Sequence, residues 1–207
     1  MFITLEGPEG SGKSCQISGL ADYVRQLGYE VLTTREPGGT AIGDQVRQVI
    51  MNLKNTEMNP RTEILLFCAA RAQLVDQVIR PALERGEVVI SDRYGDSSLA
   101  YQGYGHRLDL AMLRQILAFA TGGLKPDLTL LLDVDVEEGL RRRRSSGGEW
   151  NRLDAYEIEF HKRVRQGYYE LVSLEPERWS VIDANQSTEM VQSNIRQVVR
   201  QKLTSIK

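Results

Sequence analysis

The sequence predicts an α/β fold in which helices cover both faces of a five-stranded parallel sheet. Short apolar segments alternate along the chain with longer segments in which apolar residues recur every three or four positions, as in strands and helices. Leu128–Val134 lacks the alternation of a half-exposed strand, which indicates a strand buried on both faces. A glycine-rich turn joins the first strand to the first helix. Together these patterns are typical of a layered fold.

The strands are predicted from the short apolar segments and the residues that end them. The first leads directly into the glycine-rich turn. The second is followed by Pro37-Gly38-Gly39, which can continue neither a strand nor a helix. The third ends at Asp92-Arg93. In chain order the predicted strands are Phe2–Leu5, Val31–Thr34, Val88–Ser91, Leu128–Val134 and Trp179–Ile182.

Helical periodicity fills the intervals between the strands. The first helix follows the glycine-rich turn and ends near Gly28, because glycine favours the left-handed conformation that terminates helices. A later helix carries an apolar stripe of Phe160, Val164, Tyr168 and Leu171. After the first, the predicted helices are Ile42–Leu53, Arg61–Arg85, Leu108–Ala120, one carrying Arg141–Arg144, the striped helix and a C-terminal helix.

The domain organisation follows from length and from the absence of repeats. A chain of 207 residues without a linker predicts one domain over residues 1–207. Ser145-Ser146-Gly147-Gly148 is short and lies between two predicted helices. We therefore expect a mobile lid of about residues 141–154 rather than a domain boundary.

Composition excludes several classes of protein. The formal net charge of −2 argues against a partner that is a nucleic-acid polymer, which favours a basic excess. The longest unbroken apolar run, Ile64–Ala70, is far shorter than the roughly 20 residues of a membrane-spanning helix. Cys15 and Cys68 are too few for a disulfide framework. With no charged and apolar leader, we expect a cytoplasmic protein with no membrane partner.

The glycine-rich turn is a complete phosphate-binding motif. Gly7-Pro8-Glu9-Gly10-Ser11-Gly12-Lys13-Ser14 matches G-x-x-x-x-G-K-[ST] between a predicted strand and a predicted helix. Backbone N–H groups of such a loop surround phosphate oxygens, and the helix N-terminus adds a positive dipole end. Lys13 is expected to reach the β- and γ-phosphates of a nucleoside triphosphate, and Ser14 to ligate Mg²⁺. Asp92 is the expected carboxylate near the metal, with Asp133 as a weaker candidate.

The motif alone does not decide between kinases, GTPases and motor ATPases. A GTPase normally carries a guanine-reading N-K-x-D segment, which this sequence lacks. Motor ATPases are usually parts of larger chains or rings. A small phosphoryl-transfer enzyme fits best, because an arginine-bearing lid would neutralise charge and exclude water.

Beyond this motif, six further segments are distinctive: Leu5–Gly10, Arg35-Glu36-Pro37-Gly38-Gly39-Thr40, Leu66–Arg71, Asp92-Arg93-Tyr94, Ala100–Gly103 and Phe160–Tyr168. Through these segments the chain resembles the bacterial thymidylate kinases over nearly its whole length. This resemblance implies a three-layer P-loop NTPase fold and ATP-dependent phosphorylation of dTMP to dTDP with Mg²⁺. It also implies a homodimer. The alternatives are another nucleoside monophosphate or deoxynucleoside kinase, or a regulatory ATPase.

The resemblance also implies which residues bind the acceptor nucleotide. Phe67 resembles the residue that stacks on thymine, and Arg71 the one that reads its O4 oxygen, since arginine only donates. Arg93 resembles the residue that holds the 5′-phosphate. The remaining expected contacts are Arg35 near that phosphate, Glu9 near the 3′-hydroxyl, Tyr101 against the deoxyribose, and Ser98 and Gln102 at the base edge or sugar.

Charge that develops on the transferred phosphoryl group needs a further cation, because Lys13 is the only base in the loop. The lid supplies candidates in Arg141–Arg144 and Arg152. We expect Arg144 and Arg152 to act, with Arg141 as an alternative, because they lie nearest the Ser/Gly stretch. The family lid reads Asp-Arg-x-Glu, whereas Asn151-Arg152-Leu153-Asp154 stands here. The predicted catalytic residues are Lys13, Arg93, Arg144, Arg152 and Glu9.

Overall fold

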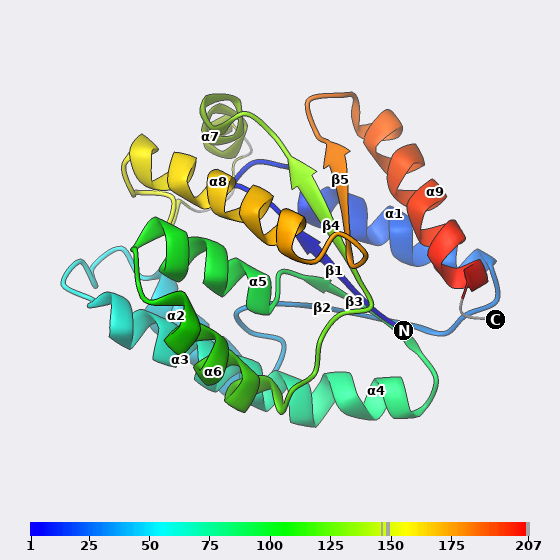
Figure 1. Ribbon diagram of the computed structural model, residues 1–207, viewed down its shortest axis with the longest axis horizontal. Helices are drawn as coiled ribbons and strands as arrows, with labels where there is room; N and C mark the ends of the chain where they lie inside the picture. Colours follow the sequence, from blue (N-terminus) through cyan, green and yellow to red (C-terminus); the bar gives the residue numbers. More distant parts are fainter. Residues whose placement is uncertain (146, 148–149, 206–207) are drawn as a thin grey trace.

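The five strands form one parallel sheet, as the sequence predicts (Figure 1). The structure is a computed structural model that describes residues 1–145, 147 and 150–205. The strand order is β2-β3-β1-β4-β5, so β1 lies in the centre and carries the phosphate-binding motif at its carboxyl end. The strands are β1 (Phe2–Glu6), β2 (Val31–Arg35), β3 (Val88–Asp92), β4 (Leu128–Asp133) and β5 (Trp179–Asp183).

Helices connect successive strands and begin close to where their apolar periodicity begins. None in the described part of the chain is long and apolar enough to cross a membrane. They are α1 (Lys13–Gln26), α2 (Ala41–Met51), α3 (Pro60–Leu74), η1 (Val75–Ile79), α4 (Arg80–Glu84), α5 (Gly95–Ser98), η2 (Leu99–Gly105), α6 (Leu110–Thr121), α7 (Val136–Ser145), α8 (Ile158–Leu174) and α9 (Thr188–Ser205).

The sheet is buried on both faces, which explains its uniformly apolar central strands. Leu130 belongs to a core shared with α1 and α9, whereas the adjacent Leu131 belongs to a core shared with α3, α6 and α8. Figure 1 shows α1 and α9 together on one side of the strands and the remaining layer on the other. The predicted stripe on α8 is buried in this second layer: Phe160, Val164, Tyr168 and Leu171. The predicted three-layer α/β fold is therefore confirmed.

Two helical segments differ from the prediction. The helix expected over Arg61–Arg85 is interrupted by the π-helical η1, just before Pro81, which has no backbone N–H to donate. The structure also has helical α5 and η2 over residues 95–105, where the sequence analysis predicted no element. Three glycines lower the helix propensity of this segment. Burial of its apolar side chains against α6 and α8 supports the helix instead.

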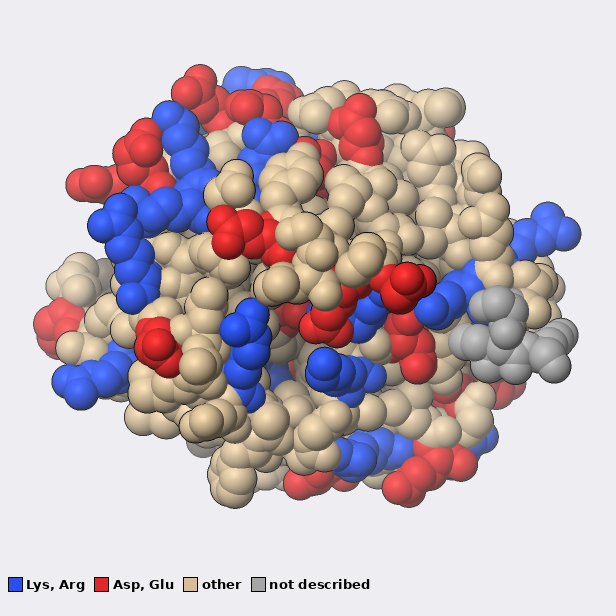
Figure 2. All heavy atoms as spheres, in the orientation of Figure 1, with Lys and Arg blue, Asp and Glu red and all other residues tan. Residues whose placement is uncertain are grey.

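The lid region begins in α7 and continues to the start of α8. Residues 146 and 148 of the predicted mobile Ser/Gly stretch lie outside the described residues. Figure 2 shows Lys and Arg side chains gathered over the α7 and α8 corner, beside acidic ones. This agrees with the sequence, in which residues 141–165 hold eight basic and four acidic side chains.

Candidate active site

A cavity of about 740 Å³ lies at the carboxyl ends of the central strands. In α/β sheets, ligands bind at this edge. It joins the phosphate-binding loop to the residues that were expected to bind the acceptor. The predicted residues that line it are Glu9, Gly10, Ser11, Gly12, Lys13, Ser14, Arg35, Phe67, Asp92, Arg93, Ser98, Tyr101 and Gln102.

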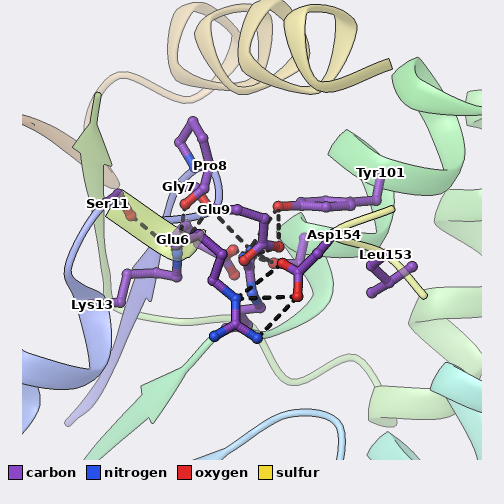
Figure 3. Close-up of polar contacts among 12 residues, drawn as sticks. Glu6, Gly7, Pro8, Glu9, Ser11, Lys13, Tyr101, Leu153 and Asp154 are labelled. Carbon is purple, nitrogen blue, oxygen red and sulfur yellow. Dashed lines mark hydrogen bonds and ion pairs between the residues drawn. The ribbon is translucent and has the colours of Figure 1, made fainter. Parts of the chain in front are cut away.

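The phosphate-binding loop has the backbone conformation its glycines permit. Gly10 and Gly12 have φ angles of 70° and 86°, which other residues rarely adopt. A side chain at Gly10 would also overlap the backbone carbonyl of Gly139 in α7, so the loop and the lid helix lie in direct contact. Lys13 Nζ donates to the carbonyls of Gly7 and Pro8 at 3.0 and 2.9 Å (Figure 3).

Ser14 and Asp92 lie side by side, as predicted for a magnesium site. Ser14 Oγ donates to Asp92 Oδ2 at 2.6 Å. The described residues contain no group of three His, Cys, Asp or Glu side chains able to hold a metal. Mg²⁺ needs no such cage, because it is usually bound by one or two protein oxygens, water and substrate phosphates. The hard oxygen donors of Ser14 and Asp92 therefore fit this ion.

The weaker metal candidate, Asp133, has a different environment. Both of its carboxylate oxygens accept hydrogen bonds from Arg165 at 2.7 Å, and Tyr169 donates to one of them at 2.6 Å. Asp133 does not line the cavity formed by the described residues. Its carboxylate serves to bind α8 to the end of β4.

Glu9 of the phosphate-binding loop forms an ion pair with Arg93. Arg93 Nη2 lies 2.8 Å from Glu9 Oε1, which also accepts from the hydroxyl of Tyr101 at 2.8 Å. Figure 3 shows Glu9 and Tyr101 pointing toward one another, with Leu153 and Asp154 of the lid region beside them. Burial alone would raise the pKa of Glu9, but Arg93 and Lys13 lower it to about 2. This carboxylate is therefore ionised at neutral pH.

Arg93 is held from several sides. Its backbone has a φ of 70°, an uncommon value outside glycine that is frequent at functional sites. Nη1 donates to the carbonyl of Gly7 and to the hydroxyls of Ser97 and Tyr168, at 3.1 to 3.2 Å. The guanidinium thus has a fixed position in the cavity wall.

Glu6 supports the residues that hold Arg93, a role that the sequence did not predict. It is fully buried, and its carboxylate accepts from Ser97 Oγ at 2.5 Å and from the Tyr168 hydroxyl at 3.0 Å. Both of these hydroxyls also contact Arg93. Burial and the charge of Asp96 raise the pKa of Glu6 to about 7. A carboxylate directly before the phosphate-binding motif, at the end of an apolar strand, was the signal that could have identified it.

Four of the residues expected to bind the base and sugar lie in the cavity wall, and Arg71 lies behind it. The Arg71 side chain is 1% exposed, and its nitrogens contact Glu36 Oε2 at 2.6 and 2.7 Å. Nη1 also donates to Ser98 Oγ at 3.1 Å. Arg71 is absent from the lining formed by the described residues, but it directly supports Ser98, which is present.

The lid arginines are arranged differently from the prediction. Arg144 is exposed and lies over the ring of Trp150, with 5.3 Å between the guanidinium carbon and the ring centre. Arg152 is buried against Glu63. Neither contributes to the described lining of the cavity, whereas Arg142 and Arg143 do. Proximity to the Ser/Gly stretch does not indicate the direction of these side chains. Which lid arginine acts in catalysis therefore stays a prediction.

The lid segment Asn151-Arg152-Leu153-Asp154, which departs from the family pattern, has its own set of hydrogen bonds. Asp154 accepts from Arg143 Nη2 and from the backbone N–H of Asn151, both at 2.9 Å. The shortened acid therefore holds Arg143 and not Arg152. Several cavity-lining residues had no predicted role, among them Glu36, Arg47, Met51 and Ser97. Arg142 and Arg143 also line the cavity, and they were among the lid candidates but were not the preferred ones.

Comparison with known proteins identifies the family. Residues 5–195 match the family model described as thymidylate kinase. Thymidylate kinase of Roseiflexus sp. (strain RS-1) is 52% identical, covering 100% of this chain and 96% of that protein. The enzyme of that name from Deinococcus radiodurans is 50% identical, covering 98% and 97%. The crystal structure of thymidylate kinase from Ehrlichia chaffeensis has a TM-score of 0.78 and 34% identity, covering 96% of this chain and 98% of that one. The chain therefore belongs to the thymidylate kinase family.

Proposed function

We propose that this chain transfers the γ-phosphate of ATP to dTMP, giving dTDP and ADP. Membership of the thymidylate kinase family supports the reaction, and the relatives named above support neither a different nucleotide kinase nor a regulatory ATPase. The observation that carries the proposal is the single cavity that joins the phosphate-binding loop to the acceptor-side residues. Phosphoryl transfer requires two substrates in line, with little other chemistry.

ATP is assigned to the loop end of the cavity. Residues 7–14 surround its β- and γ-phosphates with backbone N–H groups, and Lys13 turns from the loop carbonyls to these phosphates when they bind. Ser14 and Asp92 would hold Mg²⁺, which would neutralise charge on the phosphates. No general base is assigned, because the attacking phosphate oxygen of dTMP is already anionic.

dTMP is assigned to the other end of the cavity. Arg93 holds its 5′-phosphate with help from Arg35, and Glu9 lies near its 3′-hydroxyl. Tyr101 packs against the deoxyribose. The thymine ring stacks on Phe67 and faces Ser98 and Gln102. Arg71 lies behind Ser98 and supports this part of the wall by donating to the Ser98 hydroxyl.

Arg143 is the lid residue proposed to meet charge on the transferred group, and Arg142 assists at the ATP side. Both line the cavity from α7, within a lid of about residues 141–154. Asp154 orients Arg143 through three contacts of 2.9 to 3.1 Å. A preoriented guanidinium loses little entropy when it contacts the transition state.

A homodimer is proposed on the basis of α3 and α6. These helices pack together and expose large apolar side chains: Leu65 is 57% exposed, Met112 42% and Phe119 91%. Exposed apolar clusters of this kind mark interaction surfaces. We also propose a cytoplasmic location, where ATP and nucleotide precursors are available.

The substrate assignment is tested by measuring ADP release with ATP and Mg²⁺ in the presence of dTMP, dUMP, dCMP or thymidine. The expected result is the highest kcat/KM for dTMP. Faster use of another acceptor would overturn the assignment. ADP release that does not depend on any acceptor would instead favour a regulatory ATPase.

A further inference from the structure

A second ionic network lies behind the acceptor end of the cavity. Glu63 of α3 and Arg152 of the lid region form an ion pair at 2.5 Å, with side chains 0% and 7% exposed. Arg152 Nε donates to the carbonyl of Ile50 at 2.9 Å, and Nη1 donates to the Tyr156 hydroxyl at 2.6 Å. Each of the three guanidinium nitrogens therefore bonds to a different part of the chain: one to α2, one to α3 and one to the lid region.

The second oxygen of Glu63 contacts the cavity wall. Gln102 Nε2 donates to Glu63 Oε1 at 2.6 Å, and Gln102 lines the cavity. Because a carboxylate only accepts, it fixes the orientation of this amide: the NH₂ end faces Glu63 and the carbonyl end faces away. Burial alone would raise the pKa of Glu63, but the nearby imidazole of His106 and the charge of Arg152 lower it to about 2.

Arg152 lies between two residues that line the cavity, although Arg152 itself is not among the described residues that line it. Asn151 and Leu153, on either side of it, both line the cavity. Its backbone N–H donates to the carbonyl of Met51, a further lining residue, at 3.3 Å. Glu63 in turn lies one helical turn before Phe67 on α3. The ion pair thus connects, within one network, cavity-lining residues from α2, α3, η2 and the lid region.

We propose that Glu63 and Arg152 are positioning residues that set the geometry of the dTMP pocket, with Arg152 anchoring the lid region rather than contacting the transferred phosphate. A buried ion pair contributes little to the stability of the folded protein by itself, because well-packed apolar residues in its place usually stabilise the fold equally well or better. The ion pair instead fixes relative positions. Glu63 holds the Gln102 amide and lies on the helix that carries Phe67, and Arg152 ties the segment that carries Leu153 to that helix. The inference rests on the proposed function.

The test separates acceptor binding from chemistry. Glu63→Gln and Arg152→Lys are expected to weaken dTMP binding. The dissociation constant, measured calorimetrically without ATP, should rise by about 10-fold or more. KM for dTMP should rise in parallel, while KM for ATP stays within about twofold and kcat falls less than KM rises. Unchanged dTMP binding together with a kcat reduced about 10³-fold is the signature of an arginine finger and would overturn the inference.

Two control variants separate the proposed role from loss of an ion pair in general and from a failure to fold. Glu159→Gln/Lys162→Met removes an ion pair of 2.8 Å on α8 whose partners are 65% and 51% exposed, and should leave dTMP binding unchanged. Glu63→Leu/Arg152→Met leaves no uncompensated buried charge, so it should fold even where a single variant does not. This double variant is expected to melt at or above the wild-type temperature and still bind dTMP weakly. Wild-type affinity in it would contradict the proposal.

The wild-type rate with dTMP tests the proposed function, whereas the affinity of the variants for dTMP tests this inference. A wild-type protein that neither binds nor phosphorylates dTMP would overturn the proposed function. A wild-type protein that does both, with variants that bind dTMP normally, would overturn only the positioning role. The two failures are therefore distinguishable.

Discussion

Arg93 contacts Glu9 at 2.8 Å and is itself held in a left-handed backbone conformation at the carboxyl end of β3. The ion pair bridges two segments that are separated by 84 positions in the sequence. Both residues are proposed to face dTMP, and Glu9 also belongs to the loop proposed to bind ATP. The pair therefore connects the dTMP end of the cavity directly to the phosphate-binding loop.

Replacement of Arg93 should impair catalysis more than nucleotide binding at the loop. Arg93→Lys keeps the charge but loses the fork that contacts Glu9 and the Gly7 carbonyl together. We expect kcat/KM for dTMP to fall roughly 10²-fold, as for other groups that stabilise transition-state charge. Steady-state kinetics measures this. ATP binding followed by fluorescence is the control, and a variant with normal turnover would contradict the role of Arg93.

The central part of this site was predictable because the sheet determines it. In a parallel sheet all carboxyl ends meet at one edge, so residues that end strands or follow them directly lie together. Asp92, Arg93 and the phosphate-binding loop meet this condition, and Arg35 pairs with Asp92 in the β2–β3 register. Apolar periodicity similarly identified the strands and most helices.

The lid was not predictable in the same way. The Arg152 side chain donates to a carbonyl 102 positions earlier and pairs with a residue 89 positions earlier, so its direction depends on packing between distant helices. Four consecutive arginines in α7 point to different sides, and helical periodicity does not say which side faces the cavity. The helical segment at residues 95–105 was missed for a related reason, because tertiary burial outweighs its glycine content.

The proposed magnesium site predicts a specific metal dependence. Chelation of Mg²⁺ should abolish turnover, and readdition should restore it. Asp92→Asn keeps the hydrogen bond from Ser14 but removes a negative charge, so the Mg²⁺ concentration for half-maximal activity should rise by about 10-fold. Titration of Mg²⁺ at saturating ATP measures the shift. The same variant at Asp133, which pairs with Arg165 outside the cavity, should show the wild-type Mg²⁺ requirement.

The two neighbouring lid arginines should behave differently. Arg143 lines the cavity and is held by Asp154, whereas Arg144 is exposed beside Trp150. If Arg143 meets the charge on the transferred phosphoryl group, Arg143→Ala should lower kcat by about 10³-fold. Arg144→Ala should change kcat by less than about threefold, as is usual for an exposed side chain. The opposite order of effects would restore Arg144 as the catalytic arginine.

The exposed face of α3 and α6 predicts the oligomeric state. Phe119 is 91% exposed, so Phe119→Glu adds a charge without disturbing the core of the subunit. Sedimentation velocity should show a dimer for the wild type and a monomer for this variant, because a charge in an apolar interface is strongly unfavourable. Met190→Glu, at a 53% exposed position on α9, is the matched control and should remain dimeric. A monomeric wild type would refute the dimer.

Glu6 predicts how stability depends on pH. Burial and Asp96 raise its pKa from 4.5 to about 7 in the folded protein, against the opposing effects of Arg93, Ser97 and Tyr168. The folded state therefore binds this proton more tightly than the unfolded state does. The stabilising effect of the proton is complete below about pH 4.5 and is lost as the pH rises through about 7, a change of about 3 kcal/mol.

Glu6→Gln isolates this effect, because the amide does not titrate and the other carboxylates are common to both proteins. Urea unfolding at pH 5 to 8 should show the free energy of unfolding of the wild type falling relative to that of the variant by about 2 to 3 kcal/mol. Parallel pH profiles would mean that Glu6 is already ionised at pH 5. The Arg93 guanidinium would then be compensated by two buried carboxylates, Glu6 and Glu9, instead of by Glu9 alone.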